Sequence, residues 1–335
     1  MWVESKDEVK RYLLHVRWGK KSFSIEMSAT ATLWELKQDL LKRTNVLPDR
    51  QKLLGLTLRP NLLADTLTLQ EVCNKTEQNL VLMGTSEEQL CQFYSYPPVP
   101  EIVDDMQQGE SHGTEVVDIE KCLETLERNI KQLQIRLIHQ LRPQKKLLVL
   151  DLDNTLMHNS YSTDIQDAIR PGVHELLTAV YPFYDICIWS QTSWRWLEAK
   201  ITEMGLLLCP RYAIAFVLDR LAMTCVTVRK KRELKKHSVK PLQVVWRKFP
   251  DHFSPCNSIH VDDLSRNFVL NPENGLKVSP YSNKDPNDRE LFLLANYLVL
   301  IAQKEADFSK VNHKKWKRYE RKHRRDLENL FQTFS

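Results

Sequence analysis

The stretch Lys145–Leu156, KKLLVLDLDNTL, decides the fold of the larger part of the chain. Its apolar run Leu147–Leu150 is typical of a buried β-strand, and the run ends abruptly in Asp151 and Asp153. Two unpaired carboxylates would be costly inside a strand, so we expect them at its carboxyl end. In an open parallel sheet, ligands bind beyond the carboxyl ends of the strands. The stretch therefore predicts a polar site at the edge of a buried sheet.

Further apolar runs follow this motif and alternate with amphipathic stretches. YDICIWS, YAIAFVL and SIHVDD predict strands, whereas HELLTAVYP and SWRWLEAKITEMG predict helices. Alternating strands and helices indicate an α/β fold, a parallel sheet with helices on both faces. A last helical stretch, DRELFLLANYLVLIAQ, leads to the basic residues 301–335.

The N-terminal residues 11–85 have a different pattern. YLLHVRW and SFSIEM alternate like two strands, a helical pattern follows that Thr30 or Thr32 could cap, and LPDRQKLLGL and QNLVLMG add two short strands. The order of strand, strand, helix, strand and strand predicts a small α+β domain, long enough to fold alone.

Two segments connect these parts. Residues 86–115 are polar and rich in turn-forming residues, so we interpret them as a linker. Residues 116–142 are predicted to form a connecting helix, packed on the following domain over 143–300. A dimeric coiled coil is the alternative reading of its seam. The apolar seam of this helix consists of Val116, Ile119, Leu123, Leu126, Ile130, Leu133 and Leu137.

Composition narrows the class of protein. The chain has 335 residues, 42% hydrophobic and 27% charged, with a formal net charge of +5. These values exclude a wholly disordered or low-complexity chain and predict two domains. No apolar run approaches the ~20 residues that span a bilayer, and the N-terminus lacks a signal-peptide pattern, so we expect no membrane association. The seven cysteines form no CxxC pair, which favours reduced thiols in the cytosol or nucleus.

Other polar residues stand at the ends of the later predicted strands. Asp262 and Asp263 end SIHVDD, Ser190 ends YDICIWS, and Lys240 precedes the last acidic strand. Paired carboxylates attract a hard cation such as Mg²⁺, and they offer one nucleophile and one acid. Acids, hydroxyl and lysine in this order suit phosphoryl transfer.

These segments resemble the motifs of the haloacid dehalogenase superfamily, and LVLDLDNTL most resembles its branch of FCP/SCP-type phosphatases, the RNA polymerase II CTD phosphatases. The resemblance covers about residues 145–300. The first segment resembles ubiquitin. The combination is similar to the ubiquitin-like domain-containing CTD phosphatases. It implies a β-grasp domain followed by a haloacid dehalogenase-like parallel sheet with helices on both faces.

The resemblance implies a Mg²⁺-dependent protein serine/threonine phosphatase that acts on phosphoserine and phosphothreonine. Asp151 would form an aspartyl-phosphate, and Asp153 would protonate the leaving oxygen and then activate water. Mg²⁺ would be held by Asp151, by the backbone carbonyl of Asp153, and by one or both of Asp262 and Asp263, with Asp262 as our first choice.

The resemblance also implies the phosphate-binding residues. Ser190 and Lys240 would hold phosphate oxygens, and Thr155 would steady the loop after the nucleophile as part of the same site. Asn154 stands where many relatives carry Glu, and Ser190 stands where many carry Thr. Neither departure removes a needed function. The stretch 209–239, with its basic residues, would shape the substrate groove.

For the ubiquitin-like segment, the resemblance implies docking on the 26S proteasome regulatory particle through Leu54, Val81 and Met83. It further implies a nuclear location, with the cytoplasm as a second possibility, and dephosphorylation that lowers proteasome activity or assembly. Alternative functions are a polymerase CTD phosphatase and a catalytically weak adaptor. We expect the basic tail to form a helix with a role in nuclear import, and we do not expect nucleic acid as a partner.

Overall fold

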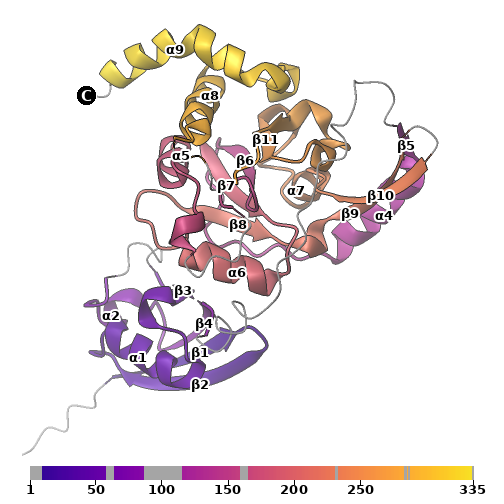
Figure 1. The fold of residues 1–335 in the computed structure, drawn as a ribbon. Coiled ribbons are helices and arrows are strands. Elements are labelled where there is room, and N and C mark those ends of the chain that lie inside the picture. Colours follow the sequence, from indigo (N-terminus) through magenta and orange to yellow (C-terminus); the bar gives the residue numbers. More distant parts are fainter. Residues whose placement is uncertain are drawn as a thin grey trace, which may run out of the picture. The chain divides into compact units, whose positions relative to one another are not determined.

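The computed structural model describes residues 10–57, 64–86, 115–158, 165–230, 233–282, 285 and 287–333. Within it the chain forms two compact units, one around an N-terminal sheet and one around a parallel sheet (Figure 1). The predicted linker, except for residues 86 and 115, lies outside the described residues.

The first unit contains a four-stranded sheet in the order β2-β1-β4-β3, and the helices over Leu33–Thr44 and Leu69–Val72 pack in its core. β1 pairs with β2 in antiparallel and with β4 in parallel orientation, which is the arrangement of a β-grasp domain. The predicted strand and helix order is confirmed. The elements are β1 (Arg11–Trp18), β2 (Lys21–Ser28), α1 (Leu33–Thr44), β3 (Lys52–Leu54), α2 (Leu69–Val72) and β4 (Glu77–Met83).

Helix α1 begins where the sequence places its cap. The Thr32 side chain accepts a hydrogen bond from the backbone N–H of Glu35, whose carboxylate accepts one from the backbone of Thr32. This reciprocal pair satisfies two N–H groups that the first helical turn leaves without partners. Leu33, Leu36 and Leu40 then lie on one buried face and pack on the alternating buried residues of β1.

The second unit contains a five-stranded parallel sheet in the order β12-β11-β6-β7-β8. The motif strand β6 is central, and Leu147–Leu150 are fully buried. A parallel sheet buries both of its faces, which explains the unbroken apolar runs in the sequence. The strands are β6 (Lys146–Asp151), β7 (Tyr184–Trp189), β8 (Ile214–Leu218), β11 (Ser258–Asp262) and β12 (Gly275–Lys277).

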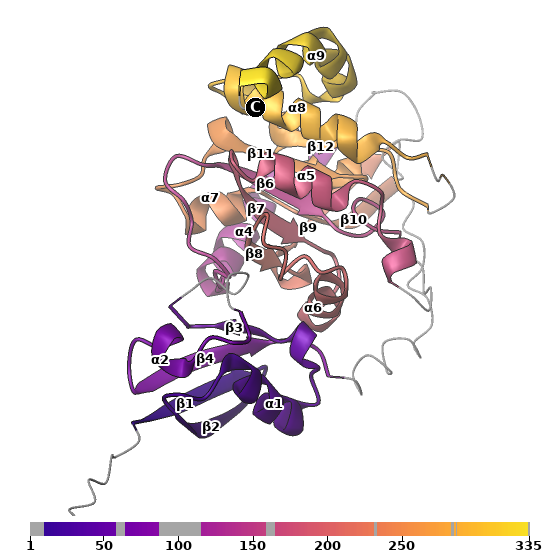
Figure 2. The ribbon, with the colours of Figure 1, turned by 90° about the vertical axis from the view of Figure 1, so that its left-hand side faces the viewer.

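Helices cover both faces of this sheet, as predicted (Figure 2). On one face, Leu147 and Val149 pack in a cluster with residues of α4 and α7. On the other side, α5 contacts α8, which in turn contacts α9. The helices are α4 (Ile119–Gln132), α5 (Val173–Val180), α6 (Trp194–Glu203), α7 (Gln243–Lys248), α8 (Glu290–Lys304) and α9 (Trp316–Thr333).

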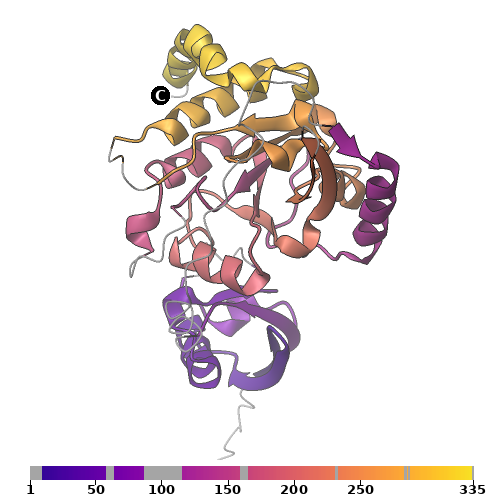
Figure 3. The same cartoon turned by 45° about the vertical axis from the view of Figure 1, so that its right-hand side comes forward.

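A separate three-stranded antiparallel sheet, in the order β10-β9-β5, lies beside α4 (Figure 3). It consists of β5 (Glu115–Val117), β9 (Thr224–Lys230) and β10 (Glu233–Val239). Within 209–239, the strand predicted from YAIAFVL is confirmed as β8, whereas the basic stretch expected to shape the substrate groove forms the β9–β10 hairpin, which was not predicted. Lys240 follows directly after β10.

The connecting helix differs from its prediction over 116–142. It spans only Ile119–Gln132, because residues 115–117 form β5 and residues 133–142 are not helical. Val116 pairs with Val228 in β9, and Leu137 forms a β-bridge with Phe216. Pairing with these strands shields the apolar side chains that a longer helix would have shielded. The chain therefore forms strand pairs at these positions, although its apolar residues are spaced as in a helix.

Residues 316–333 of the basic tail form α9, and Trp316 and Tyr319 at its start face the domain. Trp316 is buried, and Tyr319 lies edge-on against Tyr297 of α8. Within the described residues, none of the helices combines the length and the apolar character needed to cross a bilayer.

We expect Leu126→Ala to lower the free energy of unfolding of the second unit by about 2–4 kcal/mol, because Leu126 is buried in the cluster on β6. The matched control is Leu123→Ala on the same helix, 39% exposed, which should cost less than about 1 kcal/mol. Urea unfolding of the full chain measures both. Equal effects would contradict the packing of α4 described here.

Candidate active site

The carboxyl ends of the parallel strands bring the predicted site residues together. Asp151 ends β6 and Asp262 ends β11, which are neighbours in the sheet, and Ser190 follows β7 on the other side of β6. Lys240 enters from the end of β10. This edge of the sheet is where the topology of an open parallel sheet places a ligand.

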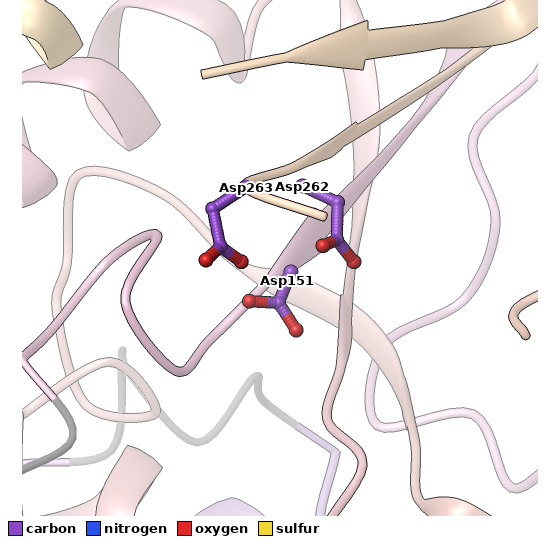
Figure 4. Close-up of side chains that lie close together, drawn as sticks. All are labelled: Asp151, Asp262 and Asp263. Atoms are coloured by element: carbon purple, nitrogen blue, oxygen red, sulfur yellow. The ribbon is translucent and has the colours of Figure 1, made fainter. Parts of the chain in front are cut away.

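Three carboxylates converge there (Figure 4). Asp151, Asp262 and Asp263 are all buried, and each offers an oxygen within 4.8 Å of the others. Asp151 Oδ2 has no hydrogen-bond partner among the described residues. Buried carboxylates at this spacing repel one another unless a cation lies between them, and oxygen ligands of this kind suit Mg²⁺. The donor set therefore fits the predicted metal.

Lys240 provides the positive charge within the chain itself. Its Nζ atom donates hydrogen bonds to Asp151 and, over 2.8 Å, to Asp262 Oδ2, and the side chain is fully buried. Burial alone would lower the pKa of Lys240, but the two carboxylates raise it above its ordinary value. Lys240 is therefore a permanent cation between two aspartates.

Asp262 is held more firmly than its neighbours. Asn267 Nδ2 donates to Asp262 Oδ2 over 2.7 Å, and the backbone N–H of Leu264 donates to Asp262 Oδ1 over 2.8 Å. Burial raises the pKa of Asp262, but the charge of Lys240 and the hydrogen bonds to its carboxylate outweigh burial and hold the pKa below its usual range. The sequence analysis missed Asn267, because no motif marks a residue in the short helical turn after β11.

The other two carboxylates of the cluster hold protons more readily. Burial, and then the charge of Asp262, raise the pKa of Asp151 well above its ordinary value. The same two causes raise the pKa of Asp263 to about 7. A cation that binds here must therefore displace protons near neutral pH.

Asp153 lies outside the carboxylate cluster and contacts Ser190. Ser190 Oγ donates to Asp153 Oδ2 over 2.9 Å and accepts from the backbone N–H of Thr192 over 3.1 Å. Asp153 is half-buried, whereas Asp151 is buried. The two carboxyl groups of the DLD motif thus have different surroundings, as separate roles require. The assignment of Ser190 to phosphate oxygens stays a prediction.

The loop after β6 turns sharply at Asn154, whose φ is +60°, a left-handed conformation that asparagine tolerates. Asn154 N–H donates to Met157 O over 2.7 Å. Thr155 is fully buried, and its Oγ1 has no partner among the described residues. The role predicted for this hydroxyl stays untested.

Arg170 holds this loop in place through hydrogen bonds, a role that was not predicted from the sequence. Its Nη1 donates to Thr155 O over 3.2 Å and to Ser279 O over 3.0 Å. Its Nε and Nη2 bind the two carboxylate oxygens of Asp288 at 3.1 and 2.8 Å. A planar guanidinium satisfied on both edges holds its partners in one geometry. An arginine before a Pro-Gly pair carries no sequence signal for this role.

In the first unit, the predicted docking residues share one face of the sheet. Leu54 pairs with Val81 across β3 and β4, and Met83 lies two residues further along β4. Leu53, Leu80 and Leu82 point to the core, so side-chain alternation places the predicted patch on the opposite face. Leu54 and Val81 are half-buried and Met83 is buried. The burial of Met83 takes it out of an exposed patch, so the prediction was wrong for this residue, and docking through Leu54 and Val81 stays a prediction.

Comparisons with known proteins agree with both units. Residues 146–309 match the family model of NLI interacting factor-like phosphatases, and residues 14–87 match that of the ubiquitin family. The chain is 40% identical to ubiquitin-like domain-containing CTD phosphatase 1 of Danio rerio, over 91% of this chain and 96% of that protein. The Arabidopsis thaliana ubiquitin-like domain-containing CTD phosphatase is 39% identical, over 91% and 89%.

Among solved structures, that of Fcp1, an essential RNA polymerase II CTD phosphatase, is similar over 57% of this chain and 72% of its own. The sequence identity is 14% and the TM-score is 0.34.

We expect the affinity for Mg²⁺ to fall about tenfold between pH 8 and pH 6. A carboxylic acid with a pKa of about 7, as at Asp263, is mostly ionised at the higher pH and mostly protonated at the lower pH, and Mg²⁺ must compete with its proton. Isothermal titration calorimetry at both pH values measures this change.

The control for this prediction is Asp263→Asn, which carries no titratable group at that position. Its affinity should be weaker at pH 8 and change less between the two pH values. An affinity of the wild type that does not depend on pH would contradict the assignment of Asp263 to the metal site.

Proposed function

Because the chain belongs to the ubiquitin-like domain-containing CTD phosphatases, we propose that this protein phosphatase hydrolyses phosphoserine and phosphothreonine through an aspartyl-phosphate on Asp151. One observation carries the proposal. Asp151 lies at the end of the central strand, next to the Lys240 ammonium group and two further carboxylates, and one of its oxygens has no partner among the described residues. A nucleophile, a cation and a metal-binding set are thereby in one place.

Repulsion between an aspartate and a phosphate dianion is the main obstacle to this reaction. Asp151, Asp262 and Asp263, with the backbone carbonyl of Asp153, would hold Mg²⁺. When bound, Mg²⁺ would supply the positive charge that offsets the repulsion. Lys240 is already in contact with Asp151 and Asp262, and its positive charge would also attract the phosphate.

Asp151 and Asp153 then carry out the two steps of the reaction, transfer of the phosphoryl group and its hydrolysis. An Asp151 carboxylate oxygen attacks phosphorus, the bond from phosphorus to the serine or threonine oxygen breaks, and Asp153 gives its proton to that oxygen. In the second step, Asp153 takes a proton from a water molecule, the water oxygen attacks phosphorus, and the bond to Asp151 breaks. The Ser190 hydroxyl donates to Asp153 and orients its carboxyl group.

The remaining polar groups would bind the phosphate oxygens. Lys240 Nζ and the Thr155 hydroxyl are donors at this edge of the sheet, and Ser190 Oγ would bind a phosphate oxygen by turning its single proton away from Asp153. Arg170 holds the loop that carries Thr155, so it acts as a positioning residue.

We expect Asp151→Asn and Asp153→Asn each to lower phosphate release from a phosphoserine peptide, in the presence of Mg²⁺, by at least about a thousandfold. The matched control is Asp167→Asn, the same change at an exposed residue of the same unit, which should keep full activity. Circular dichroism verifies that the variants fold. A fully active Asp153→Asn enzyme would disprove the acid and base role of that residue.

For the target, we propose the nuclear 26S proteasome, reached through the ubiquitin-like unit, with dephosphorylation lowering proteasome activity or assembly. Leu54 and Val81 form an adjacent apolar pair on the face of the sheet that does not pack on α1. An apolar pair on a small domain of this kind suits a docking surface. The phosphatase family name of the relatives instead suggests the polymerase CTD as substrate, which is the competing candidate.

We expect the double variant Leu54→Ala, Val81→Ala to lose at least about 90% of its binding to 26S proteasomes, because truncating apolar anchors removes most of the energy of a small interface. Hydrolysis of a phosphoserine peptide should stay unchanged. Pull-down from nuclear extract measures the binding. Leu13→Ala, which is on the same sheet and 37% exposed, is the control.

Undiminished binding by the double variant would contradict the patch. A competition assay between proteasomal and polymerase-tail phosphopeptides then ranks the two candidate targets by their kcat/KM.

A further inference from the structure

A cationic surface begins immediately before α9. At 100° per residue, Trp316, Tyr319 and His323 point to the domain, and the opposite side of the helix is exposed. No ion pair neutralises the exposed basic residues on that side within the described part of the chain. Arg318, Arg321, Lys322 and Arg325 are exposed on that side of α9, and Lys314 and Lys315 are exposed in the short helical turn before it; the six residues together are named here the cationic face.

A cavity of about 380 Å³ adjoins this face, in the size range of ligand sites. Lys277 and Lys314 line it together with apolar residues. Phe268 lies so close to Gly275 that a Cβ atom there would come within 2.2 Å of its ring, so Phe268 gives the cavity a fixed wall. The lining residues are Ser265, Phe268, Val269, Pro272, Gly275, Lys277 and Lys314.

The cavity lies close to the active site without containing any of its residues. Lys277 of β12 is in register with Asp262 of β11, and adjacent strands are ~4.8 Å apart. Ser265 follows Asp263 by two residues. In Figure 2, α8 and α9 lie at the same end of the second unit as β11 and β12. A peptide bound in this cavity would therefore need only a few further residues to reach the proposed phosphate site.

The chemistry of this surface favours an acidic protein segment over other polyanions. Single-stranded nucleic acid binds on exposed aromatic side chains, but Trp316 and Tyr319 point inward. An amphipathic helix binds membranes by its apolar face, and the apolar face of α9 packs on α8. Carboxylates match the cationic face, and an apolar side chain matches the cavity wall.

We propose that the cationic face and the adjoining cavity form a docking site for an acidic segment of the phosphoprotein substrate. One apolar side chain of the segment enters the cavity against Phe268 and Val269, and its carboxylates contact Lys314 and Arg318. The statement that this segment belongs to the substrate rests on the proposed function, but the binding itself does not.

The test is fluorescence anisotropy with the full chain and a fluorescein-labelled peptide of glutamates and aspartates around one leucine. We expect Lys314→Glu with Arg318→Glu to weaken binding about tenfold at low salt, since two exposed attractions become repulsions. The matched control is Lys121→Glu with Lys131→Glu, two exposed lysines on α4. A peptide with serine in place of leucine should also bind more weakly.

A second measurement separates docking from catalysis. A phosphoserine peptide extended by the acidic segment should have a lower KM than the short peptide, with kcat unchanged, and Lys314→Glu with Arg318→Glu should remove only this difference. Equal weakening by the α4 control, absence of binding, or tighter binding of a single-stranded oligonucleotide or of anionic phosphatidylserine vesicles would overturn the proposal. Failure of the proposed function would instead abolish turnover of both peptides while anisotropy stays unchanged.

Discussion

The second unit depends on the buried contact between Lys240 and the aspartates Asp151 and Asp262. Removing one partner of a buried ion pair typically costs about 3–5 kcal/mol, because the other charge then lacks compensation. The parallel sheet supplies the aspartates at neighbouring strand ends, and the β9–β10 hairpin supplies the lysine. The main sheet and the smaller sheet are therefore joined by buried charged groups, which cost the most free energy when one of them lacks its partner. A single cation makes the acidic edge of the sheet compatible with burial, and the same cation faces the place where a phosphate would bind.

The environment of each aspartate explains how similar side chains obtain different chemistry. Asp262 is fixed by Lys240, Asn267 and a backbone N–H, so it remains ionised and stationary. Asp151 has one oxygen that no residue in the described part of the chain contacts by a hydrogen bond, and Asp153 lies apart beside the Ser190 hydroxyl. Residues of the same type thus differ in how firmly their carboxylate oxygens are held. Arg170 adds a second support, because it ties the loop behind Asp153 to residues more than a hundred positions later.

Much of this arrangement was predictable from the sequence, because polar residues directly after buried runs leave few alternatives. In the four-stranded and the five-stranded sheet, the strands with unbroken or alternating apolar residues were predicted. The proximity of Asp151, Asp262 and Lys240 was predicted as well. The β9–β10 hairpin was not, since few of its residues are buried and apolar and its alternating pattern is therefore weak. The helix over 116–142 was predicted too long, because Val116 and Leu137 find strand partners that spacing along the chain does not reveal. Arg170 and Asn267 were missed because their partners are brought together only by the folded chain.

The position of β6 in the sheet has a consequence for how the chain folds. β6 is the first strand of its sheet to be synthesised, yet it is central, and its neighbour β11 comes about a hundred residues later. Until then, an apolar strand has one open edge, which is a typical origin of slow folding and of association between partly folded chains. Asp151 meanwhile lacks both Lys240 and Asp262, so collapse around it is penalised by an uncompensated charge. The acidic residues at the end of β6 thus also oppose burial of this strand before its partner strands are present.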